Sequence, residues 1–480
     1  MESLSYQLKR NWRWVAGGVT LIVLHIVLAR ISPEFPYGRD LLEKPLVLLV
    51  ALEMVAGVVY LLVIVRMVFA PAGTRLLAWI LGVGLVLRIV LLNSTPMQED
   101  DYYRYLWDGA VVAEGINPYA YAPDLVRQSE ISAAIPGALE RLADESGDVV
   151  QRVNHAHLRT IYPPTAQAAF ALAHWLRPWS MVAWRVVLLA FDVAVLVMLA
   201  LVLRAANLSL VHLAIYWWNP LLVKEVFNSG HMDVVALPFV LGAVLLAIHR
   251  RHAISGILLG VAAGAKIWPA VLLPIVLRNS IPQPRKALMA AGGFGVVMAL
   301  MCVPIYFGGL DDNSGFTAYG RMWEMNDALY MLFLWGVKFL GRGIELGSHG
   351  AHLITRLIVG TIVVLWTLWL SRRPVINAGD LSERCLLVVA AVFLLSPTQY
   401  PWYYVWMLPF LAIRPRLSLL LLTALLPLYY LRFRLVALEK VGMFDHGVVW
   451  LEYAPVWILL IRETIRGQTL KFDKVRKDCV

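Results

Sequence analysis

The chain has 480 residues, of which 60% are hydrophobic and only 15% are charged, and its formal charge is +10. A soluble globular protein has about 25% charged residues, so this composition excludes an ordinary soluble domain. The basic residues are distributed over many turns and form no single stripe, which argues against nucleic-acid binding. The three cysteines, Cys302, Cys385 and Cys479, lack the spacing of a disulfide framework or a metal site.

Apolar runs of the length needed to cross a bilayer, about 20 residues, recur along the whole chain. Some runs are shorter, so we expect an all-α polytopic membrane protein with about 11–14 transmembrane helices, and we interpret residues 1–480 as a single membrane domain. The first run follows Lys9, Arg10 and Arg13 and is interpreted as a retained helix, because no convincing signal-peptide cleavage site follows it. The candidate spans are 14–31, 46–69, 74–93, 161–176, 181–203, 209–223, 232–249, 254–277, 287–307, 327–340, 352–371, 384–396, 402–413, 417–431 and 447–461.

The positions of the basic residues predict the topology. Lysine and arginine gather in connections between apolar runs, for example at Arg250 and Arg251, which is the positive-inside pattern of a plasma-membrane protein. With the N-terminus inside, the third span ends on the outer face, so residues 94–160 lie outside and the basic tail 462–480 lies in the cytoplasm. The segment 94–160 is the one long polar insertion in the chain, and long loops in compact proteins usually carry function.

Acidic and aromatic residues are concentrated at the start of the outer segment, in the stretch MQEDDYYRYLWDGAVVAEGINPYAYAP (Met97–Pro123). The consecutive acids Glu99, Asp100 and Asp101 repel one another beside apolar helices, which should raise the pKa of at least one of them. A carboxylate in this place could act as a general base, but a solvated loop start or a helix N-cap explains the acids equally well. If residues 101–114 form a helix, one of its faces carries Asp101, Arg104, Tyr105 and Asp108.

Polar residues also occur beside later spans, and among them Lys266 is the strongest candidate for a functional residue. It lies within the apolar stretch 256–277, just before Pro269, and a hairpin of two half-helices would place it at a break that faces a cavity. A cation at that depth needs an anion, and a partner carboxylate and a lipid phosphate are equally good candidates. His231 by itself is more often a hydrogen-bonded structural group than a ligand, and together with Asp233 it lacks the further ligands of a zinc site.

Aromatic residues are dense in the same outer segments, for example at Tyr102, Trp107 and Trp402. Belts of tyrosine and tryptophan at the membrane interface account for most of them, but flat aromatic rings also stack on sugar rings. A carboxylate base, cations for a phosphate and aromatic walls together suit the transfer of a group from a lipid phosphate to a hydroxyl acceptor, since phosphate is already a good leaving group. Glycoside hydrolysis would need a second, proton-donating carboxyl group.

Residues Glu99–Pro123 resemble the first outer loop of bacterial membrane glycosyltransferases of the GT-C superfamily, above all of the mannosyltransferases that use polyprenyl-phosphate mannose. The catalytic subunit of GPI mannosyltransferase I is more distantly similar. Four further motifs match in family order: TIYPPTAQ (160–167), WNPLLVKEVFNSGHMDV (218–234), GAKIWPAVLLP (264–274) and SPTQYPWYYVWMLPF (396–410). The match covers most of the chain from the third span onward, so residues 1–73 are expected to form extra N-terminal helices.

The resemblance implies a GT-C-like helical bundle, a long first outer loop with short helices, and an inverting transfer of a sugar, with mannose expected, from a polyprenyl-phosphate donor. The acceptor would be a hydroxyl group of a lipid-linked glycan or glycolipid on the outer face of the plasma membrane. The catalytic base would be Asp101, with Asp100 as the neighbour that tunes it or replaces it. For binding the donor phosphate we predict Lys266, Arg104, His231 and Arg321, although an arginine in a polar loop, as Arg321 is, is more often simply solvated. For binding the sugar or the acceptor we predict Glu99, Tyr105, Trp107, Asp108, Asn117, Tyr162, Asn219, Asp233, Tyr400, Trp402 and Tyr403.

The cofactor and the function class leave alternatives open. The related GPI enzyme carries an Asp-x-Asp motif, and in this chain Glu99 replaces the first aspartate of that motif. The resemblance therefore does not decide whether a divalent cation is a cofactor, and the ligands of such a cation are unknown. A transporter or flippase of lipid-linked sugars predicts inverted repeats, and the sequence shows none. A transferase of the same fold that uses arabinose or glucose would differ in only a few hydroxyl contacts. A non-catalytic scaffold would leave the acid cluster without a purpose.

Overall fold

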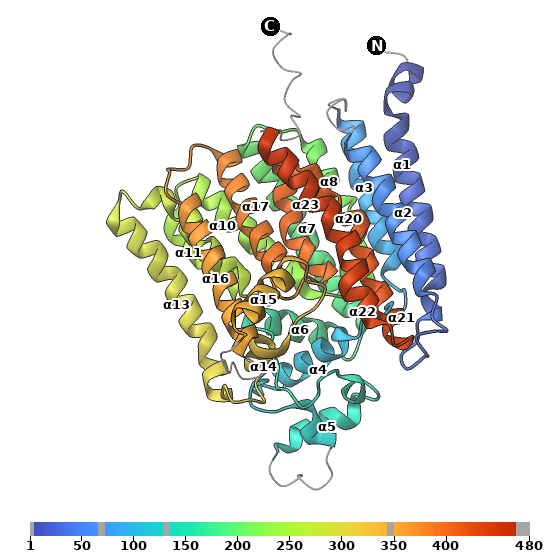
Figure 1. Ribbon diagram of the computed structural model, residues 1–480, viewed down its shortest axis with the longest axis vertical. Coiled ribbons are helices and arrows are strands. Elements are labelled where there is room, and N and C mark those ends of the chain that lie inside the picture. The colour runs from blue at the N-terminus through green and yellow to red at the C-terminus, as the bar shows by residue number, and fades with distance from the viewer. Residues whose placement is uncertain (1–3, 66–72, 128–134, 343–349, 467–480) are drawn as a thin grey trace. The chain divides into compact units, whose positions relative to one another are not determined.

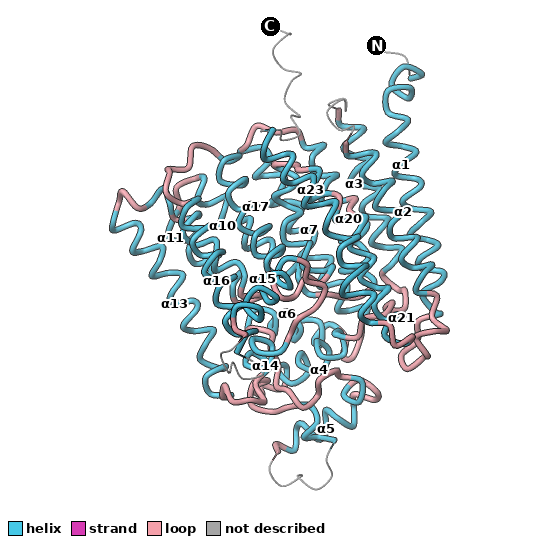
Figure 2. The backbone as a smooth tube through the Cα atoms, viewed as in Figure 1, coloured by secondary structure: helices cyan, strands magenta, loops and turns pink. Residues whose placement is uncertain are grey.

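The computed structural model describes residues 4–65, 73–127, 135–342 and 350–466, and helices make up most of them (Figure 2). No strand occurs within these ranges, where Met325 and Thr398 form one isolated parallel bridge. This confirms the predicted all-α class. Residues 467–480 of the predicted cytoplasmic tail and residues 128–134 of the predicted outer loop lie outside the described residues.

Seven helices in the described residues are long and apolar enough to cross a membrane, or up to eight if one bent pair, Pro220–Asn228 with Met232–Ile248, counts as a span. They confirm a polytopic membrane protein, but they are fewer than the roughly 11–14 spans predicted from apolar run length. The seven are Trp12–Glu34, which includes most of α1 (Leu4–Ile31), α2 (Leu46–Ile64), α3 (Thr74–Leu91), α7 (Met181–Ala205), α13 (Pro284–Gly308), α16 (Gly350–Leu370) and Leu417–Ala437.

Proline accounts for part of this difference, because it lacks the backbone N–H that a helix needs and clashes with the preceding turn. The predicted span 209–223 is divided into α8 (Leu213–Trp217) and α9 (Pro220–Val223). The predicted span 402–413 consists of a 3-10 helix at Pro401–Met407 followed by α18 (Leu408–Ile413).

Length and charge account for the rest. α6 (Pro164–Leu176) and α15 (Leu329–Leu340) are too short for a full crossing. α17 (Ala378–Leu395) and α23 (Val449–Arg466) have sufficient length, but each carries more than two charged side chains: Asp380, Glu383 and Arg384 in α17, and Glu452, Arg462, Glu463 and Arg466 in α23. Within the described residues, apolar run length therefore gives more candidate spans than there are helices long and apolar enough to cross a membrane.

The chain forms two compact units, and the first comprises Met1–Gln98, Leu199–Asn228 and Tyr400–Val480. Within it α1, α2 and α3 lie side by side, as Figure 1 shows. Buried polar side chains join its segments: the guanidinium of Arg88 donates to the carbonyl oxygen of Trp217 at 2.7 Å. The predicted N-terminal helices thus belong to this unit, and the assignment of residues 1–480 to one domain stays a prediction.

The second unit comprises Glu99–Met198 and Ser229–Gln399. α10 (Leu237–Ile248), α11 (His252–Ala263) and α13 pack in sequence, as Figure 1 shows. Small residues permit the close approach of α11 and α13: a Cβ atom on Gly256 would lie 2.0 Å from the carbonyl oxygen of Ala290. The described part of the predicted outer loop carries short helices, including α4 (Asp101–Ala113) and α5 (Gly137–Glu145), as expected.

The predicted break at Lys266 is present in this second unit. α11 ends at Ala263, and a 3-10 helix begins only at Trp268, so Lys266 lies in the connection between them. α12 (Leu273–Val276) follows and contacts α11. Non-helical backbone of this kind leaves polar groups that must be satisfied inside the protein.

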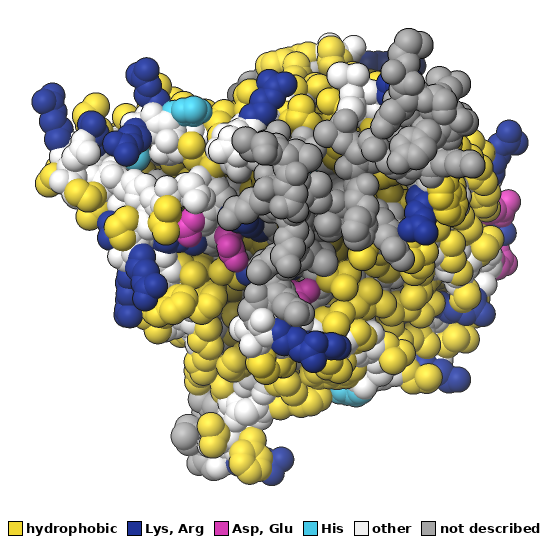
Figure 3. All heavy atoms as spheres, turned by 90° about the horizontal axis from the view of Figure 1, so that it is seen from above, with side chains coloured by type: hydrophobic (Ala, Val, Ile, Leu, Met, Phe, Trp, Pro, Cys, Tyr) yellow, Lys and Arg dark blue, Asp and Glu magenta, His cyan; other side chains and the backbone are white. Residues whose placement is uncertain are grey.

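The surface carries the apolar side chains expected of a protein surrounded by lipid. Figure 3 shows hydrophobic side chains over much of the visible face, with lysine and arginine scattered among them. α13 is the most exposed of the apolar helices: Leu288 is 72% exposed and Phe307 is 77% exposed. A helix with such side chains in water would lose the hydrophobic stabilisation that lipid contact provides.

Candidate active site

The acid cluster lies at the N-terminus of α4. Gln98 adopts a left-handed backbone conformation with φ of 70°, and the chain then turns through Glu99 and Asp100 into the helix, whose first residue is Asp101. The unpaired N–H groups of a helix N-terminus favour negative charge, which stabilises carboxylates at this place. The predicted helix is confirmed, and its buried face includes Arg104, Tyr105, Trp107 and Asp108.

One asparagine joins the two aspartates of the cluster. The side-chain amide nitrogen of Asn154 donates to Oδ1 of Asp100 at 2.9 Å and to Oδ1 of Asp101 at 2.8 Å. Asn154 follows a 3-10 turn at Val150–Arg152, late in the outer segment. Sequence reasoning missed this residue, although the polar run Asn154-His155-Ala156-His157 inside a functional loop was the available signal.

His231 lies between two of the acids. Its Nε2 is 4.0 Å from Oε2 of Glu99, and its Nδ1 is 3.9 Å from Oδ2 of Asp101. The side chain of His231 is fully buried, whereas that of Asp101 is 26% exposed. Gly230, with φ of 80°, makes the turn before His231, and its carbonyl oxygen accepts a hydrogen bond of 2.7 Å from the indole of Trp184. The structure thus brings His231 together with two acids from a segment far from it in the sequence.

Lys266 forms an ion pair with Asp233. The aspartate is 1% exposed and the lysine 18% exposed, so the pair is largely removed from water. The charge of Lys266 also interacts electrostatically with Asp101. Of the two anions considered for this cation, the structure provides the carboxylate. Because the pair is close to the acid cluster, a phosphate bound there would share Lys266 with Asp233.

The two arginines predicted to bind the donor phosphate have different surroundings. Arg104 is buried and donates to the backbone carbonyl oxygens of Asn154 at 3.2 Å and His155 at 3.0 Å. Arg321 forms an exposed ion pair of 2.6 Å with Asp312, and the two side chains are 66% and 86% exposed. For both arginines, binding of the donor phosphate stays a prediction.

Aromatic side chains pack behind the acid cluster. Tyr105 stacks on Phe170 at a centroid distance of 4.7 Å and meets the rings of Tyr162 at 5.0 Å and Trp184 at 5.7 Å edge to face. Burial raises the pKa of Tyr105 and of Tyr162 well above the usual value, so both phenols stay neutral. Such a cluster fixes α4 against α6, and sugar binding by these two tyrosines stays a prediction.

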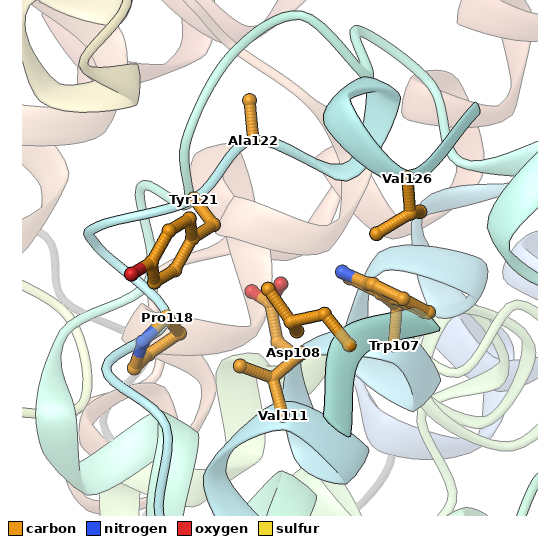
Figure 4. Close-up of a pocket in the computed structure, with 8 residues that line it drawn as sticks. Trp107, Asp108, Val111, Pro118, Tyr121, Ala122 and Val126 are labelled. Atoms are coloured by element: carbon orange, nitrogen blue, oxygen red, sulfur yellow. The ribbon is translucent and has the colours of Figure 1, made fainter. Parts of the chain in front are cut away.

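Asp108 faces a small cavity of about 10 Å³, and Figure 4 shows its carboxylate among the side chains that line the cavity. That volume has room for about one water molecule. Burial raises the pKa of Asp108, and the opposing effects of Arg104 and of hydrogen bonds from Thr160 and Gln167 are smaller. The Gln167 amide donates to Oδ2 of Asp108 at 3.1 Å. The residues that line the cavity are Trp107, Asp108, Val111, Pro118, Tyr121, Ala122, Val126 and Leu139.

The remaining predicted ligands make structural contacts. Asn117, in the second unit, donates to the carbonyl oxygen of Pro304 at 2.8 Å. Asn219, in the first unit, accepts from the backbone N–H of Leu222 at 3.0 Å, which caps α9. Also in the first unit, the ring of Tyr400 stacks on Trp402 at 4.4 Å and meets Tyr403 edge to face at 5.4 Å. Their roles toward a sugar stay predictions.

Within the described ranges, no group of three or more histidine, cysteine, aspartate or glutamate side chains is arranged to hold a metal ion. The acid cluster combines Glu99, Asp100 and Asp101 with His231 and the Lys266–Asp233 pair. This set can accept a proton from a hydroxyl group and can hold an anion beside a lysine. The fold and this site define a polytopic helical membrane protein equipped for group transfer.

Comparison with known proteins gives the family resemblance. Residues 160–397 match the model of Glycosyltransferase family 87. A curated relative from Mycobacterium tuberculosis, named polyprenol-phosphate-mannose-dependent alpha-(1-2)-phosphatidylinositol pentamannoside mannosyltransferase, is 24% identical over 258 residues, which are 52% of this chain and 56% of the relative. The chain thus matches a little over half the length of that relative. No solved structure matches the chain.

Both matches confirm the predicted resemblance to membrane glycosyltransferases of the polyprenyl-phosphate-sugar-dependent kind. The region matched by the family model contains His231, Asp233 and Lys266. The acids at 99–101 precede that region, so their assignment depends on the geometry and on the sequence motif.

Proposed function

We propose that the protein transfers mannose from a polyprenyl-phosphate donor to a hydroxyl group of a glycolipid or lipid-linked glycan on the outer face of the plasma membrane. The observation that carries this proposal is the position of Asp101 at the start of α4, where it interacts with the charge of Lys266 and lies beside His231. The name of the mycobacterial relative supports the donor class and the glycolipid class of acceptor.

Asp101 would act as the general base. Its carboxylate accepts the proton of the acceptor hydroxyl while the acceptor oxygen forms a bond to the anomeric carbon of the sugar. The bond between that carbon and the phosphate oxygen breaks, and its electron pair leaves with polyprenyl phosphate. Attack from the side opposite the phosphate inverts the configuration of the anomeric carbon.

Lys266 would stabilise the phosphate as it leaves. Negative charge grows on the phosphate oxygen in the transition state, and a cation already held in place by Asp233 needs little rearrangement to meet it. The pairing with Asp233 also compensates the charge of Lys266 when no donor is bound. A lipid-linked donor suits an outer site, since nucleotide sugars are cytoplasmic.

The test uses the purified full chain in nanodiscs with radiolabelled polyprenyl-phosphate mannose and a membrane lipid extract as the source of acceptor. We expect label in a new glycolipid with the wild type and a loss of at least about 100-fold in Asp101→Asn. Asp144→Asn, which changes an exposed acid of α5 in the same outer segment, is the matched control and should retain activity. The one-bond NMR coupling constant between the anomeric carbon of the product and its hydrogen identifies the anomer and thus reports inversion.

Other outcomes correct the proposal in defined ways. Loss only in Asp100→Asn would move the base by one residue. Transfer only from polyprenyl-phosphate arabinose or glucose would replace mannose by that sugar. Movement of intact donor across the bilayer without transfer would contradict a transferase and support a flippase.

A further inference from the structure

The side chain of Asn154 occupies a chemically demanding position. Its amide nitrogen carries two hydrogens, and it donates to Oδ1 of Asp100 and to Oδ1 of Asp101. Two carboxylates on consecutive residues, with Glu99 directly before them, repel one another when all are charged. Donor groups that point at both carboxylates stabilise their charged forms, so Asn154 counters this repulsion.

Asn154 is held in place from the helix that carries Asp101. The guanidinium of Arg104, one turn further along α4 and 6% exposed, donates to the carbonyl oxygens of Asn154 and His155. His155 has a left-handed φ of 45°, an uncommon conformation for a residue with a side chain. Its ring packs edge to face on Trp323 at a centroid distance of 4.8 Å. Strained backbone of this kind persists where the surroundings fix it.

The hydrogen bonds leave the two oxygens of Asp101 in different situations. Oδ1 accepts from Asn154 at 2.8 Å, whereas Oδ2 lies 3.9 Å from Nδ1 of His231, beyond hydrogen-bond distance. The carboxylate is 26% exposed. Oδ2 is therefore the oxygen that remains available to take a proton.

We propose that Asn154 is a positioning residue for the acid pair: it binds Oδ1 of both aspartates, counters the repulsion between them and directs Oδ2 of Asp101 toward the acceptor hydroxyl. This inference rests on the proposed function for the role of Asp101 as base. It assigns Arg104 to the support of the loop that carries Asn154, one step away from the reacting atoms.

The sign of the expected pH effect follows from the hydrogen bonds. Removing donors that stabilise a charged carboxylate favours its protonated form, so the acid limb of the rate profile moves to higher pH. A hydrogen bond to a charged group corresponds to a shift of about one pH unit. Asn154 is uncharged, so its substitution removes no titratable group from the surroundings of Asp101, which are Glu99, Asp100, Arg104, Tyr105, His155, Tyr162, His231, Asp233 and Lys266.

The first experiment measures kcat and KM of Asn154→Ala between about pH 5 and about pH 9 in the transfer assay. We expect kcat to fall by up to about tenfold on the acid limb of the profile, the donor KM to change less than about twofold, and the loss to shrink as the pH rises above that limb. Asn154→Asp keeps the size of the side chain but replaces its hydrogen-bond donor by a third carboxyl group. This variant should move the acid limb of the rate profile to still higher pH. Gln151→Ala, an exposed residue three positions earlier, is the matched control. An equal loss at every pH would show a merely structural role and overturn the inference.

The second experiment does not need activity. A water-soluble diazo reagent takes the proton of a carboxyl group and then forms its ester with loss of N2, and mass spectrometry of the peptide around residues 99–101 reports the labelled fraction at each pH. The pH of half labelling should rise by about one unit in Asn154→Ala and stay unchanged in Gln151→Ala. No rise would overturn the inference even if the wild type transfers mannose. A rise in a protein that transfers no sugar would uphold the role of Asn154 and contradict the proposed function.

Discussion

Gly109 fixes how closely the helix of the acid cluster approaches its neighbour. An added Cβ atom at Gly109 would lie 2.5 Å from the carbonyl oxygen and 2.7 Å from the carbonyl carbon of Phe170 in α6. These atoms belong to the backbone and cannot rotate away. Ordinary contact begins at 3.4 Å, so 3.4 − 2.5 gives about 0.9 Å by which α4 and α6 must separate locally in Gly109→Ala. The Phe170 ring also stacks on Tyr105, and that packing would loosen.

The expected cost follows from this displacement. Overpacking of a core costs about 1–3 kcal/mol, so Gly109→Ala should lower the thermal unfolding midpoint of the purified protein. Asp101 lies eight residues earlier on the same helix, about 12 Å along its axis. A displacement of about 1 Å in a catalytic group can reduce the rate about 100-fold, so we expect transfer to fall by about 10- to 100-fold.

The matched control is Gly292→Ala in α13, where no atom lies within 4 Å of an added Cβ. Alanine there should stabilise the helix by about 0.5–1 kcal/mol. Both variants would be compared with the wild type by thermal unfolding and by the transfer assay. If Gly109→Ala unfolds at or above the wild-type midpoint and transfers at the wild-type rate, the contact between α4 and α6 does not position the acid cluster.

Three further outcomes are expected. Asp233→Ala leaves Lys266 without its buried carboxylate and should destabilise the protein by about 3 kcal/mol, whereas Asp233→Leu with Lys266→Met should cost less, as a denaturation series will show. Burial raises the pKa of Asp108 above its usual 3.8, so ionisation of this carboxyl group opposes folding. The thermal unfolding midpoint of the wild type should therefore fall relative to that of Asp108→Asn as the pH rises above 3.8. Arg321→Ala tests the predicted phosphate role of this arginine: a tenfold rise in the donor KM would support that role, whereas a change of less than about twofold would show that only an exposed pair with Asp312 is lost.

The amino-acid sequence by itself determined that this protein lies in a membrane and is helical. Long apolar runs require lipid, and lipid requires every backbone polar group to be satisfied within a helix. The sequence also located the helix that begins at Asp101 and the break at Lys266, because both depend on residues a few positions apart. The family motifs led to the same segments.

Only the tertiary structure decided which side chains meet. Lys266 pairs with Asp233, 33 residues earlier, and Asn154 binds Asp101 across 53 residues. Arg104 donates hydrogen bonds to the carbonyl oxygens of Asn154 and His155, about 50 residues further along the chain. Apolar run length also gave more candidate spans than the described residues have long apolar helices, since prolines divide some of the runs. Hydropathy and local spacing predict that a segment is buried and that a charge within it requires a partner. Which side chain is that partner depends on the packing of helices that are far apart in the chain.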